Sequence, residues 1–243
     1  MTGFRRVLFR SKNGFLIFNK DDKYIPIIKN PQFSLKAYSI KQKEAKNLKK
    51  ILKIPGTHNV SNALAALSVA RILGIKDRIS FKVLSEYKGS WRRFEIKITK
   101  LHGNLRGKTR RITVISDYGH HPNEILATLK AAREKYPKKV IWCVFQPHQY
   151  QRTYYLFNDF VKVFGLVPID NIIITDIYDV VGREEKGIKA GISSEKLVKK
   201  IGKKSIKYLP VGDAEKYVKE NIKSGNVLII MGAGDIYELF YKF

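Results

Sequence analysis

The fold is decided by residues 112–148, which read ITVISDYGHHPNEILATLKAAREKYPKKVIWCVFQPH. Two apolar runs of strand length, at 109–116 and 139–145, lie on either side of a segment whose apolar residues recur at helical spacing. That segment begins at Pro122, and proline is favoured in the first turn of a helix. The order strand, helix, strand is typical of a parallel sheet that is covered by helices.

The same alternation continues to the end of the chain. A strand at 93–100 is expected to form a hairpin with 109–116 around the turn His102-Gly103-Asn104. Further strands are expected at 171–175, 207–209 and 227–231, and further helices at 154–164, 194–201, 213–222 and 235–241. Because such alternation builds a mostly parallel sheet with helices on both faces, residues 91–243 are predicted to be one α/β, Rossmann-like domain.

Residues 12–88 follow a less regular pattern. Apolar runs predict the two strands of a β-hairpin, a third strand and a segment left open as helix or strand, at 14–18, 24–28, 33–40 and 41–51. A short helix is expected at 79–88, and Gly89-Ser90 marks the boundary to the next domain.

The helix expected before that boundary is apolar on almost every side. Asn59 or Ser61 is expected to cap its start, and Gly74 to end it in the left-handed conformation. A helix without a polar face must be buried on several sides, and one hairpin with one strand is too little to cover it. We therefore expect residues 12–88 to be the tail of a partial α/β domain whose earlier part is missing.

Residues 1–11 read MTGFRRVLFRS. They lack the apolar core of a signal peptide, and in a helix their arginines would fall on every face. The stretch FRRVLFRS looks like the translation of a common DNA-sequencing adapter, so we expect a non-native stretch and a native reading frame that begins upstream of Lys12. The alternative is an ordinary disordered basic N-terminus.

The chain is strongly basic, with 47 lysine and arginine residues against 21 acidic ones and a formal net charge of +26. Residues 1–90 hold 19 basic and 5 acidic residues, and residues 91–243 hold 28 and 16. The excess is therefore spread evenly, which favours a lysine-rich solvated surface over a dedicated nucleic-acid site. We predict no specific nucleic-acid partner.

Composition excludes several other classes. Hydrophobic residues make up 44% of the chain and aromatic residues 12%, which rules out a disordered or collagen-like protein. The longest apolar runs are of strand length, far below the roughly 20 residues that span a bilayer, so no membrane association is predicted. The single Cys143 cannot form an intrachain disulfide and fits a reducing compartment.

Four expected strands are each followed by polar, titratable or glycine-rich residues. These sequences are DYGHHP at 117–122, QPHQYQR at 146–152, DIYD at 176–179 and GAGD at 232–235. Ligands of open parallel sheets bind at the carboxyl ends of the strands, so the four sequences predict a cleft along one sheet edge.

The candidate side chains have distinct chemical roles, and two of them, Asp117 and His148, also have a plain structural alternative. Asp117 is suited to accept hydrogen bonds from a ribose diol, or only to cap its turn. His120 and His121 lie at a helix start, where N–H groups favour anions. Arg152 is suited to hold a carboxylate or phosphate as a fork, and His148 is either a ligand or a packing residue.

Two further kinds of site are weighed and disfavoured. His58, His120, His121, His148 and Asp117 could supply ligands to a metal hydrolase, but no HExxH is present and adjacent histidines in an extended turn point apart. The fragment Gly232-Ala233-Gly234 lacks the third glycine of a dinucleotide fingerprint, since Tyr237 stands there.

Seven segments together resemble the later part of the Mur ligase family. They are GTHNVSNALAALSVARILGI (56–75), KGSWRRFE (88–95), SDYGHHPNEILATLKAAREKYP (116–137), VFQPHQYQRT (144–153), DIYDVVGREE (176–185), GISSEKL (191–197) and MGAGDIYEL (231–239). The QPH and DIY segments favour the members that join L-alanine to UDP-N-acetylmuramate over those that recycle a murein tripeptide. The resemblance is strong over residues 50–243 and faint over 12–49.

The resemblance implies a domain plan and a reaction. Residues 12–88 would be the tail of the central ATP-binding domain, and 91–243 the complete C-terminal ligase domain. ATP would activate the muramate carboxylate as an acyl phosphate, and the L-alanine amine would displace the phosphate, with Mg²⁺ neutralising the phosphate charges. This step of peptidoglycan precursor synthesis would take place in the bacterial cytoplasm.

The resemblance also implies roles for individual residues. Those matching the ATP side of the cleft are His58, Asn59, Arg92, Arg93 and Asp117. Those matching the L-alanine and muramate side are Tyr118, His120, His148 and Arg152.

Two departures from the family pattern matter. Gln149 stands where the family usually has arginine, so Arg152 alone would provide a charged fork. No GxxxxGK[ST] motif and no counterpart of the family's magnesium ligands is present, so we expect no metal site in this chain and no activity from it alone. The alternatives are a basic Rossmann-like module that binds a nucleotide or nucleic acid without catalysis, and an interaction protein that arose by domain loss.

Overall fold

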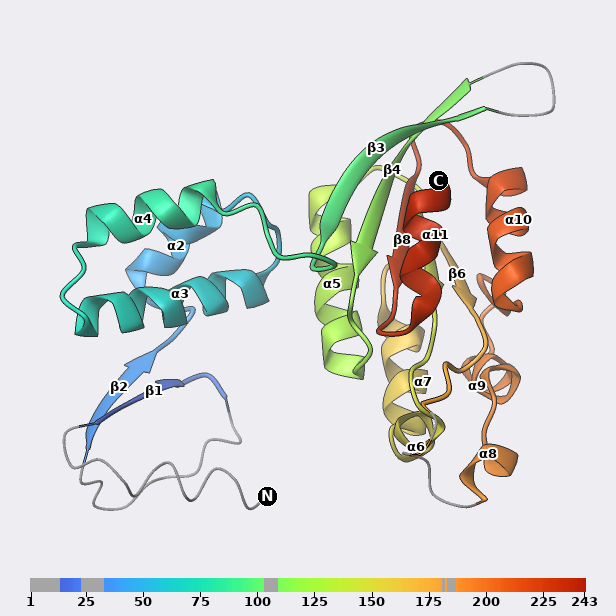
Figure 1. Ribbon diagram of the computed structural model, residues 1–243, viewed down its shortest axis with the longest axis horizontal. Helices are drawn as coiled ribbons and strands as arrows, with labels where there is room; N and C mark the ends of the chain where they lie inside the picture. Colours follow the sequence, from blue (N-terminus) through green and yellow to red (C-terminus); the bar gives the residue numbers. More distant parts are fainter. Residues whose placement is uncertain (1–13, 23–32, 103–108, 181, 183–186) are drawn as a thin grey trace. The chain divides into compact units, whose positions relative to one another are not determined.

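The structure is a computed structural model that describes residues 14–22, 33–102, 109–180, 182 and 187–243 (Figure 1). The chain divides into two compact units, Met1–Lys88 and Gly89–Phe243. The segment 1–11, the strand expected at 24–28 and the turn expected after His102 lie outside the described residues. No helix among the described residues is both long and apolar enough to cross a bilayer.

The first unit contains a short two-stranded sheet and three helices. Strand β1 (Phe15–Asn19) pairs in parallel with β2 (Ser34–Tyr38), with Phe15 opposite Ser34. The helices are α2 (Lys43–Ile51), α3 (Thr57–Ile72) and α4 (Asp77–Glu86). The segment 41–51, left open from sequence, is therefore helical.

Helix α3 begins earlier than its sequence suggests. Its N-cap is Gly56, which has a positive φ of 100° and offers no side-chain cap, so the prediction of Asn59 or Ser61 was wrong. The Asn59 side chain instead donates to the carbonyl of Pro55, 2.7 Å away. The expected end is confirmed, because Gly74 adopts a left-handed φ of 73° just after the helix.

Only one face of α3 is buried among the described residues. Its buried side chains, Val60, Ala63, Leu64 and Leu67, include three that pack with Ala45 and Leu48 of α2. On another face Val69 is 44% exposed and Leu73 69% exposed. The expected burial on several sides is therefore not found within the part of the chain that the structure describes.

The second unit is built on a six-stranded sheet with the order β3-β4-β8-β5-β6-β7. The strands are β3 (Glu95–His102), β4 (Thr109–Asp117), β5 (Ile141–Phe145), β6 (Asn171–Ile174), β7 (Ile206–Tyr208) and β8 (Val227–Met231). Only the edge strand β3 runs antiparallel to its neighbour, and all other pairs are parallel. The predicted mostly parallel α/β sheet is confirmed.

Helices cover both faces of this sheet (Figure 1). The helices of this unit are α5 (Pro122–Lys135), α6 (Tyr150–Tyr155), α7 (Phe157–Leu166), α8 (Ile188–Gly191), α9 (Ser194–Ile201), α10 (Val211–Asn221), the 3₁₀ turn η1 (Asp235–Tyr237) and α11 (Glu238–Lys242). The single helix expected at 154–164 is two helices that meet at Leu156.

The alternation of side chains along the strands explains this two-sided packing. In β5, Cys143 and Phe145 join a core with Phe160 and Phe164 of α7, and Trp142 faces the opposite way into a second core with α10 and α11. Successive strand residues point to opposite faces, so a strand that is apolar throughout must be covered on both sides.

Candidate functional site

The strand register places four strand ends side by side. Asp117, the last residue of β4, pairs with Met231 of β8, which also pairs with Phe145 of β5. Phe145 in turn pairs with Ile174 of β6. The loops that follow these four strands therefore leave one edge of the sheet together, as the sequence predicted.

Asp117 holds backbone at this edge. Its Oδ2 accepts the N–H of Phe94 (3.0 Å), and its Oδ1 accepts the N–H of Gly119 (2.8 Å) and the hydroxyl of Thr128 (3.2 Å). The side chain is buried, and this burial raises the pKa of Asp117 above its ordinary value. Both oxygens are thus engaged by the chain itself.

The two neighbouring arginines differ sharply. Arg92 is 5% exposed, and its Nη2 donates to the carbonyls of Gly232 and, at 3.2 Å, Gly234. The side chain of Arg93 is 51% exposed and lies 3.8 Å from a carboxylate oxygen of Glu124. A ligand in solvent therefore reaches Arg93 far more readily than Arg92.

The start of α5 is closed by its own side chains. Glu124 Oε2 accepts the backbone N–H groups of His120 (3.1 Å) and His121 (3.2 Å). The ring of His121 accepts the N–H of Asn123 at 3.4 Å, which completes a capping box. The carboxylate of Glu124 thus takes the N–H groups at which the sequence predicted an external anion.

His120 is held as a neutral imidazole. Its Nδ1 lies 3.1 Å from the carbonyl of Tyr118, which can only accept, so this nitrogen carries the hydrogen and Nε2 is the acceptor. Burial lowers the pKa of His120, and the nearby charges of Arg152 and Arg93 lower it further. The Tyr118 carbonyl and the Glu124 carboxylate oppose this shift without reversing it.

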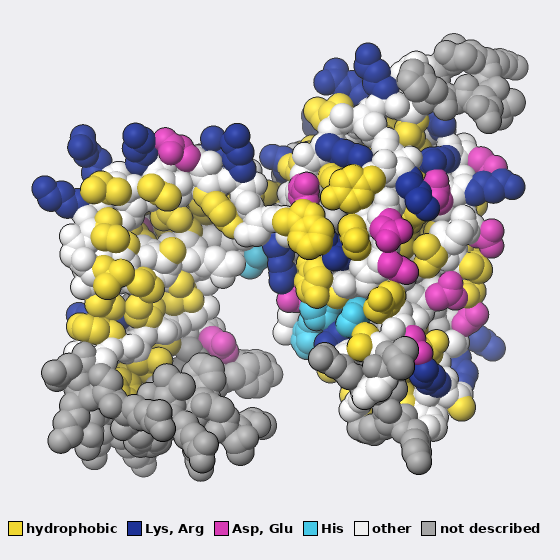
Figure 2. All heavy atoms as spheres, viewed as in Figure 1, with side chains coloured by type: hydrophobic (Ala, Val, Ile, Leu, Met, Phe, Trp, Pro, Cys, Tyr) yellow, Lys and Arg dark blue, Asp and Glu magenta, His cyan; other side chains and the backbone are white. Residues whose placement is uncertain are grey.

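Four rings follow one another across the strand ends. The ring centroids of Tyr118 and His120 are 5.4 Å apart, those of His120 and His148 are 5.9 Å apart, and those of His148 and Tyr178 are 5.4 Å apart. We call Tyr118, His120, His148 and Tyr178 the ring row. Histidine side chains are seen together on the surface of the second unit (Figure 2).

Arg152 joins the ring row from helix α6. Its Nη1 lies 3.2 Å from Nδ1 of His148 and donates to the His148 carbonyl at 3.2 Å. Three of the four residues expected to line the substrate side come from the strand-end loops, and the fourth, Arg152, follows one turn later. The structure brings together the four substrate-side candidates, Tyr118, His120, His148 and Arg152. The side chain of Asp117 does not join them, because it points into the interior.

Sequence reasoning missed the residues that support this row. Gln146 is buried, donates to Asp235 (2.8 Å) and accepts the N–H of Ile236 (3.2 Å). A Cβ on Gly234 would lie 2.4 Å from Gln146 Oε1 and 2.5 Å from Cγ of Tyr178, so glycine is required there. The clue was present in the GAG run, which was expected to be a strand-end loop and an incomplete nucleotide motif but not a site of close packing.

Gln149 has an unusual backbone. It adopts a left-handed φ of 70° at the start of α6, and its N–H donates to the carbonyl of Tyr178 (2.9 Å). A residue other than glycine is uncommon in that region, and such outliers cluster at functional sites. The position at which the family pattern is broken is therefore tied to the ring row through the backbone.

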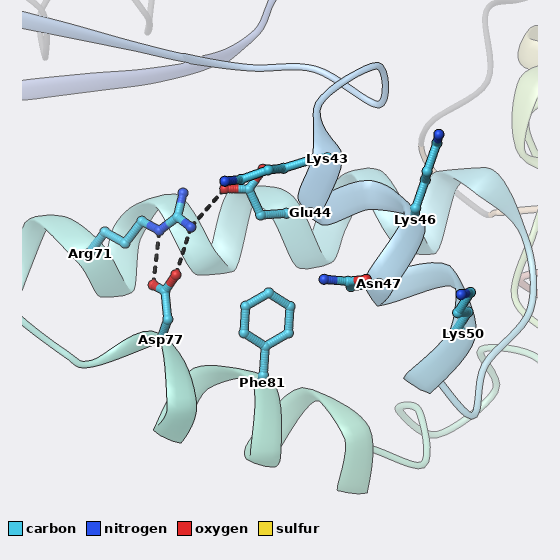
Figure 3. Close-up of a pocket in the computed structure, with 8 residues that line it drawn as sticks. All are labelled: Lys43, Glu44, Lys46, Asn47, Lys50, Arg71, Asp77 and Phe81. Carbon is cyan, nitrogen blue, oxygen red and sulfur yellow. Dashed lines mark hydrogen bonds and ion pairs between the residues drawn. The ribbon is translucent and has the colours of Figure 1, made fainter.

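The remaining candidates, His58 and Asn59, lie in the first turn of α3 in the first unit and are half-buried. In the same unit a hollow of about 540 Å³ opens between α2, α3 and α4 (Figure 3). Arg71 is ion-paired there with Glu44 (2.8 Å) and Asp77 (2.7 Å), and Phe81 faces the hollow. Neither His58 nor Asn59 lines it.

The candidate metal ligands are not gathered into one site among the described residues. In the ranges that the structure describes, no group of three or more His, Cys, Asp or Glu side chains is placed to hold an ion. The residues considered for a metal hydrolase are committed elsewhere: His121 caps α5 and Asp117 binds backbone N–H groups. The side chains described here do not fit a resident metal ion.

Comparison with known proteins identifies the group to which this chain is related. The model of the Mur ligase, glutamate ligase domain matches residues 92–234. UDP-N-acetylmuramate–L-alanine ligase of Caldanaerobacter subterraneus is 37% identical in an alignment 258 residues long, gaps included, and the alignment covers 95% of this chain and 53% of that protein. The enzyme of the same name from Acetivibrio thermocellus is 44% identical over 198 residues, covering 79% of this chain and 39% of that protein.

Solved structures of Mur ligases also resemble this chain. The UDP-N-acetylmuramate-alanine ligase of Thermotoga maritima matches with a TM-score of 0.58 and 30% identity, covering 79% of this chain and 38% of that one. MurF of Acinetobacter baumannii, 12% identical with a TM-score of 0.63, shares the fold. The chain spans about half the length, or less, of the curated relatives named above. The family model matches residues 92–234, which are more than half of the chain. The chain therefore belongs to the Mur ligase family.

Proposed function

We propose that this chain is the C-terminal part of an ATP-dependent ligase that joins L-alanine to UDP-N-acetylmuramate in bacterial peptidoglycan synthesis. The observation that carries the proposal is the 37% identity to a ligase of that name across 95% of the chain. The ring row with Arg152 supports it, because it gathers the residues that the family resemblance assigns to the amino-acid and muramate side.

The chemistry requires an activated acid and a deprotonated amine. A carboxylate is a poor electrophile, so the muramate carboxylate is first phosphorylated by ATP to give an acyl phosphate. The amine of L-alanine then attacks the acyl carbon, the C–O bond to phosphate breaks, and inorganic phosphate leaves beside ADP. The fragment's own residues are proposed to bind and orient the reactants of the second step.

Each substrate-side residue has a role that its hydrogen bonds allow. The neutral His120 keeps Nε2 as an acceptor, which suits an N–H of the incoming amine. Arg152, held by His148, presents a guanidinium suited to the carboxylate of the amino acid. Tyr118 places its ring beside His120 at one end of the row.

On the nucleotide side, exposure separates the candidates. We propose that Arg93, which is half-exposed, contacts the nucleotide, and that Arg92 and Asp117 hold the loops around it. Asn59 and His58 remain proposals for the adenine end. No step is assigned to magnesium, since the described side chains do not fit it.

The test is a chimera in which this chain replaces the matching half of the Caldanaerobacter ligase. We expect release of ADP and phosphate that depends on both UDP-N-acetylmuramate and L-alanine, and none from the 243-residue chain alone. Arg152→Ala in the chimera is expected to abolish turnover. Lys135→Ala, at the far end of α5, is the matched control and should leave turnover unchanged.

Binding of ADP to the chimera, measured by calorimetry, separates misfolding from lack of function. A chimera that binds ADP and either fails to ligate any amino acid or prefers one other than L-alanine would refute the proposal. Turnover by the 243-residue chain alone would refute its assignment as an incomplete part of the enzyme.

A further inference from the structure

The segment that leads into β3 is held in an unfavourable backbone conformation. Arg92 has φ 54° and Phe94 has φ 52°, both in the left-handed region that residues with a Cβ rarely occupy. Such a conformation is unfavourable and persists only where surrounding contacts enforce it. The left-handed conformation of Phe94 is held in place by Asp117, which accepts the Phe94 N–H, and by burial of the Phe94 ring.

The left-handed backbone conformation of Arg92 is held in place by the contacts of its own guanidinium. Nη2 donates to the carbonyls of Gly232 and Gly234, which belong to the loop after β8. The guanidinium carbon also lies 4.4 Å from the ring centroid of Tyr237 and 4.8 Å from that of Tyr118. One buried cation thus joins the segment before β3, the loop after β4 and the loop after β8.

These contacts connect Arg92 to both ends of the ring row, Tyr118 and Tyr178. At one end, the backbone carbonyl of Arg92 accepts the N–H of Tyr118 (2.7 Å), and the Tyr118 carbonyl orients His120. At the other end, Gly234 is bound by Arg92 and is pressed against Tyr178, which stacks on His148 with an interplanar angle of 13°. Arg92 itself touches neither histidine.

We propose that Arg92 is a positioning residue whose buried guanidinium fixes both ends of the ring row, and so sets the separation and tilt of His120 and His148. Burial keeps it from contacting substrate directly. The inference rests on the proposed function only for what the row binds, because the positioning itself is a property of this chain and is tested without any ligand.

The experiment uses NMR on the 243-residue chain. Two quantities are measured: the pKa of His120, assigned among the five histidines with a His120→Gln variant, and hydrogen exchange of the Tyr118 amide. The charged and titratable groups that face His120 are Glu124, Arg152, Arg93, Tyr118 and His148, and none of them is altered.

The variants are Arg92→Met, Arg92→Lys and a matched control, Arg133→Met. Arg133 also binds backbone carbonyls, those of Pro168 (2.9 Å) and Lys139 (2.7 Å), and it pairs with Asp170. Its loss removes comparable structural contacts away from the strand-end loops. Lys at position 92 keeps the charge but lacks the planar guanidinium that lies against the Tyr118 and Tyr237 rings while it reaches both carbonyls.

We expect Arg92→Met to raise the pKa of His120 toward its ordinary value and to speed exchange of the Tyr118 amide about tenfold, as local opening becomes easier. Arg92→Lys should do the same to a smaller extent, and it decides the question if the Met variant does not fold. Arg133→Met should change neither quantity. Unchanged values in a folded Arg92 variant, or equal shifts in Arg133→Met, would overturn the proposal.

Discussion

The two units of this chain differ in how fully their apolar side chains are buried. In the second unit a parallel sheet is covered on both faces, and two separate cores form around it. In the first unit a helix that is apolar on nearly every side has one covered face among the described residues. Hydrophobic side chains are correspondingly visible on the surface of the first unit (Figure 2).

The contrast shows what a site needs. In the second unit, strand register and two-sided packing bring four loops to one edge, and the side chains there are held by hydrogen bonds within the unit. The first unit offers His58 and Asn59 in the first turn of α3, and the Asn59 side chain is held by the carbonyl of Pro55. We therefore expect mutations to affect the two units unequally and separately.

The largest effect is expected from Phe145→Ala in the second unit. Phe145 is fully buried, with ring centroids 5.2 Å from Phe164 and 6.0 Å from Phe160. Truncating such a ring costs about 3–5 kcal/mol of unfolding free energy. Both tryptophans, Trp91 and Trp142, lie in this unit, so urea unfolding followed by their fluorescence reads it alone. A midpoint equal to that of the wild type would contradict the two-sided core.

Leu64→Ala probes the first unit. Leu64 is fully buried in the core formed by α2 and α3, and its truncation should cost about 2–5 kcal/mol. Helical circular dichroism should be lost at lower urea, while the tryptophan fluorescence transition stays in place. If both signals shifted together, the two units would not unfold separately, and the comparison drawn above would fail.

Gly234→Ala should be the most damaging small substitution at the strand ends. The added methyl group would overlap Gln146 and Tyr178, which we expect to cost about 1–3 kcal/mol. Gly165→Ala in α7 is the control, because its Cβ meets nothing within 4 Å and alanine favours a helix by about 0.5–1 kcal/mol. Opposite signs in the fluorescence-detected midpoints are the expected result, and equal signs would argue against tight packing of the GAG loop.

Acid should weaken the second unit through His120. Its pKa is lowered by burial in the folded state, so its contribution to stability is present above about pH 6.5 and is lost as the pH falls through the lowered value. The loss should level off below the lowered pKa, where the folded and unfolded states are both protonated. Unfolding followed by fluorescence between pH 7.5 and 5 should show this loss in wild type and in His58→Gln. A His120→Gln variant with an undiminished loss would show that another group is responsible.

The smallest effect is expected from Leu73→Ser in the first unit. Leu73 is 69% exposed just after α3, so its replacement should change the unfolding free energy by no more than about 0.5 kcal/mol. Circular dichroism during urea unfolding is the measurement, with Leu64→Ala as the reference for a buried leucine. A cost close to that of Leu64→Ala would mean that the Leu73 side chain is covered in solution.

Local sequence pattern was sufficient for most of the second unit. The apolar runs predicted all six of its strands in chain order, and Pro122 located the start of α5. The local pattern failed where long-range contacts decide where a helix begins or ends. The break at Leu156 and the N-cap at Gly56 depend on backbone geometry for which the local side chains give no clear signal. The candidate site was found as a row of loops, but Gln146, Glu124 and Tyr178 carry no local signal of their supporting roles.

By itself the sequence determined that this is an α/β chain with titratable loops at the strand ends, because alternation of apolar residues and the position of turns are local properties. Only the tertiary structure decided which side chains face outward. Arg92 and Arg93 are adjacent and chemically identical, yet one is buried against carbonyls more than a hundred residues away and the other is half-exposed. Burial of a side chain depends on what packs against it from distant parts of the chain, and no local pattern records that.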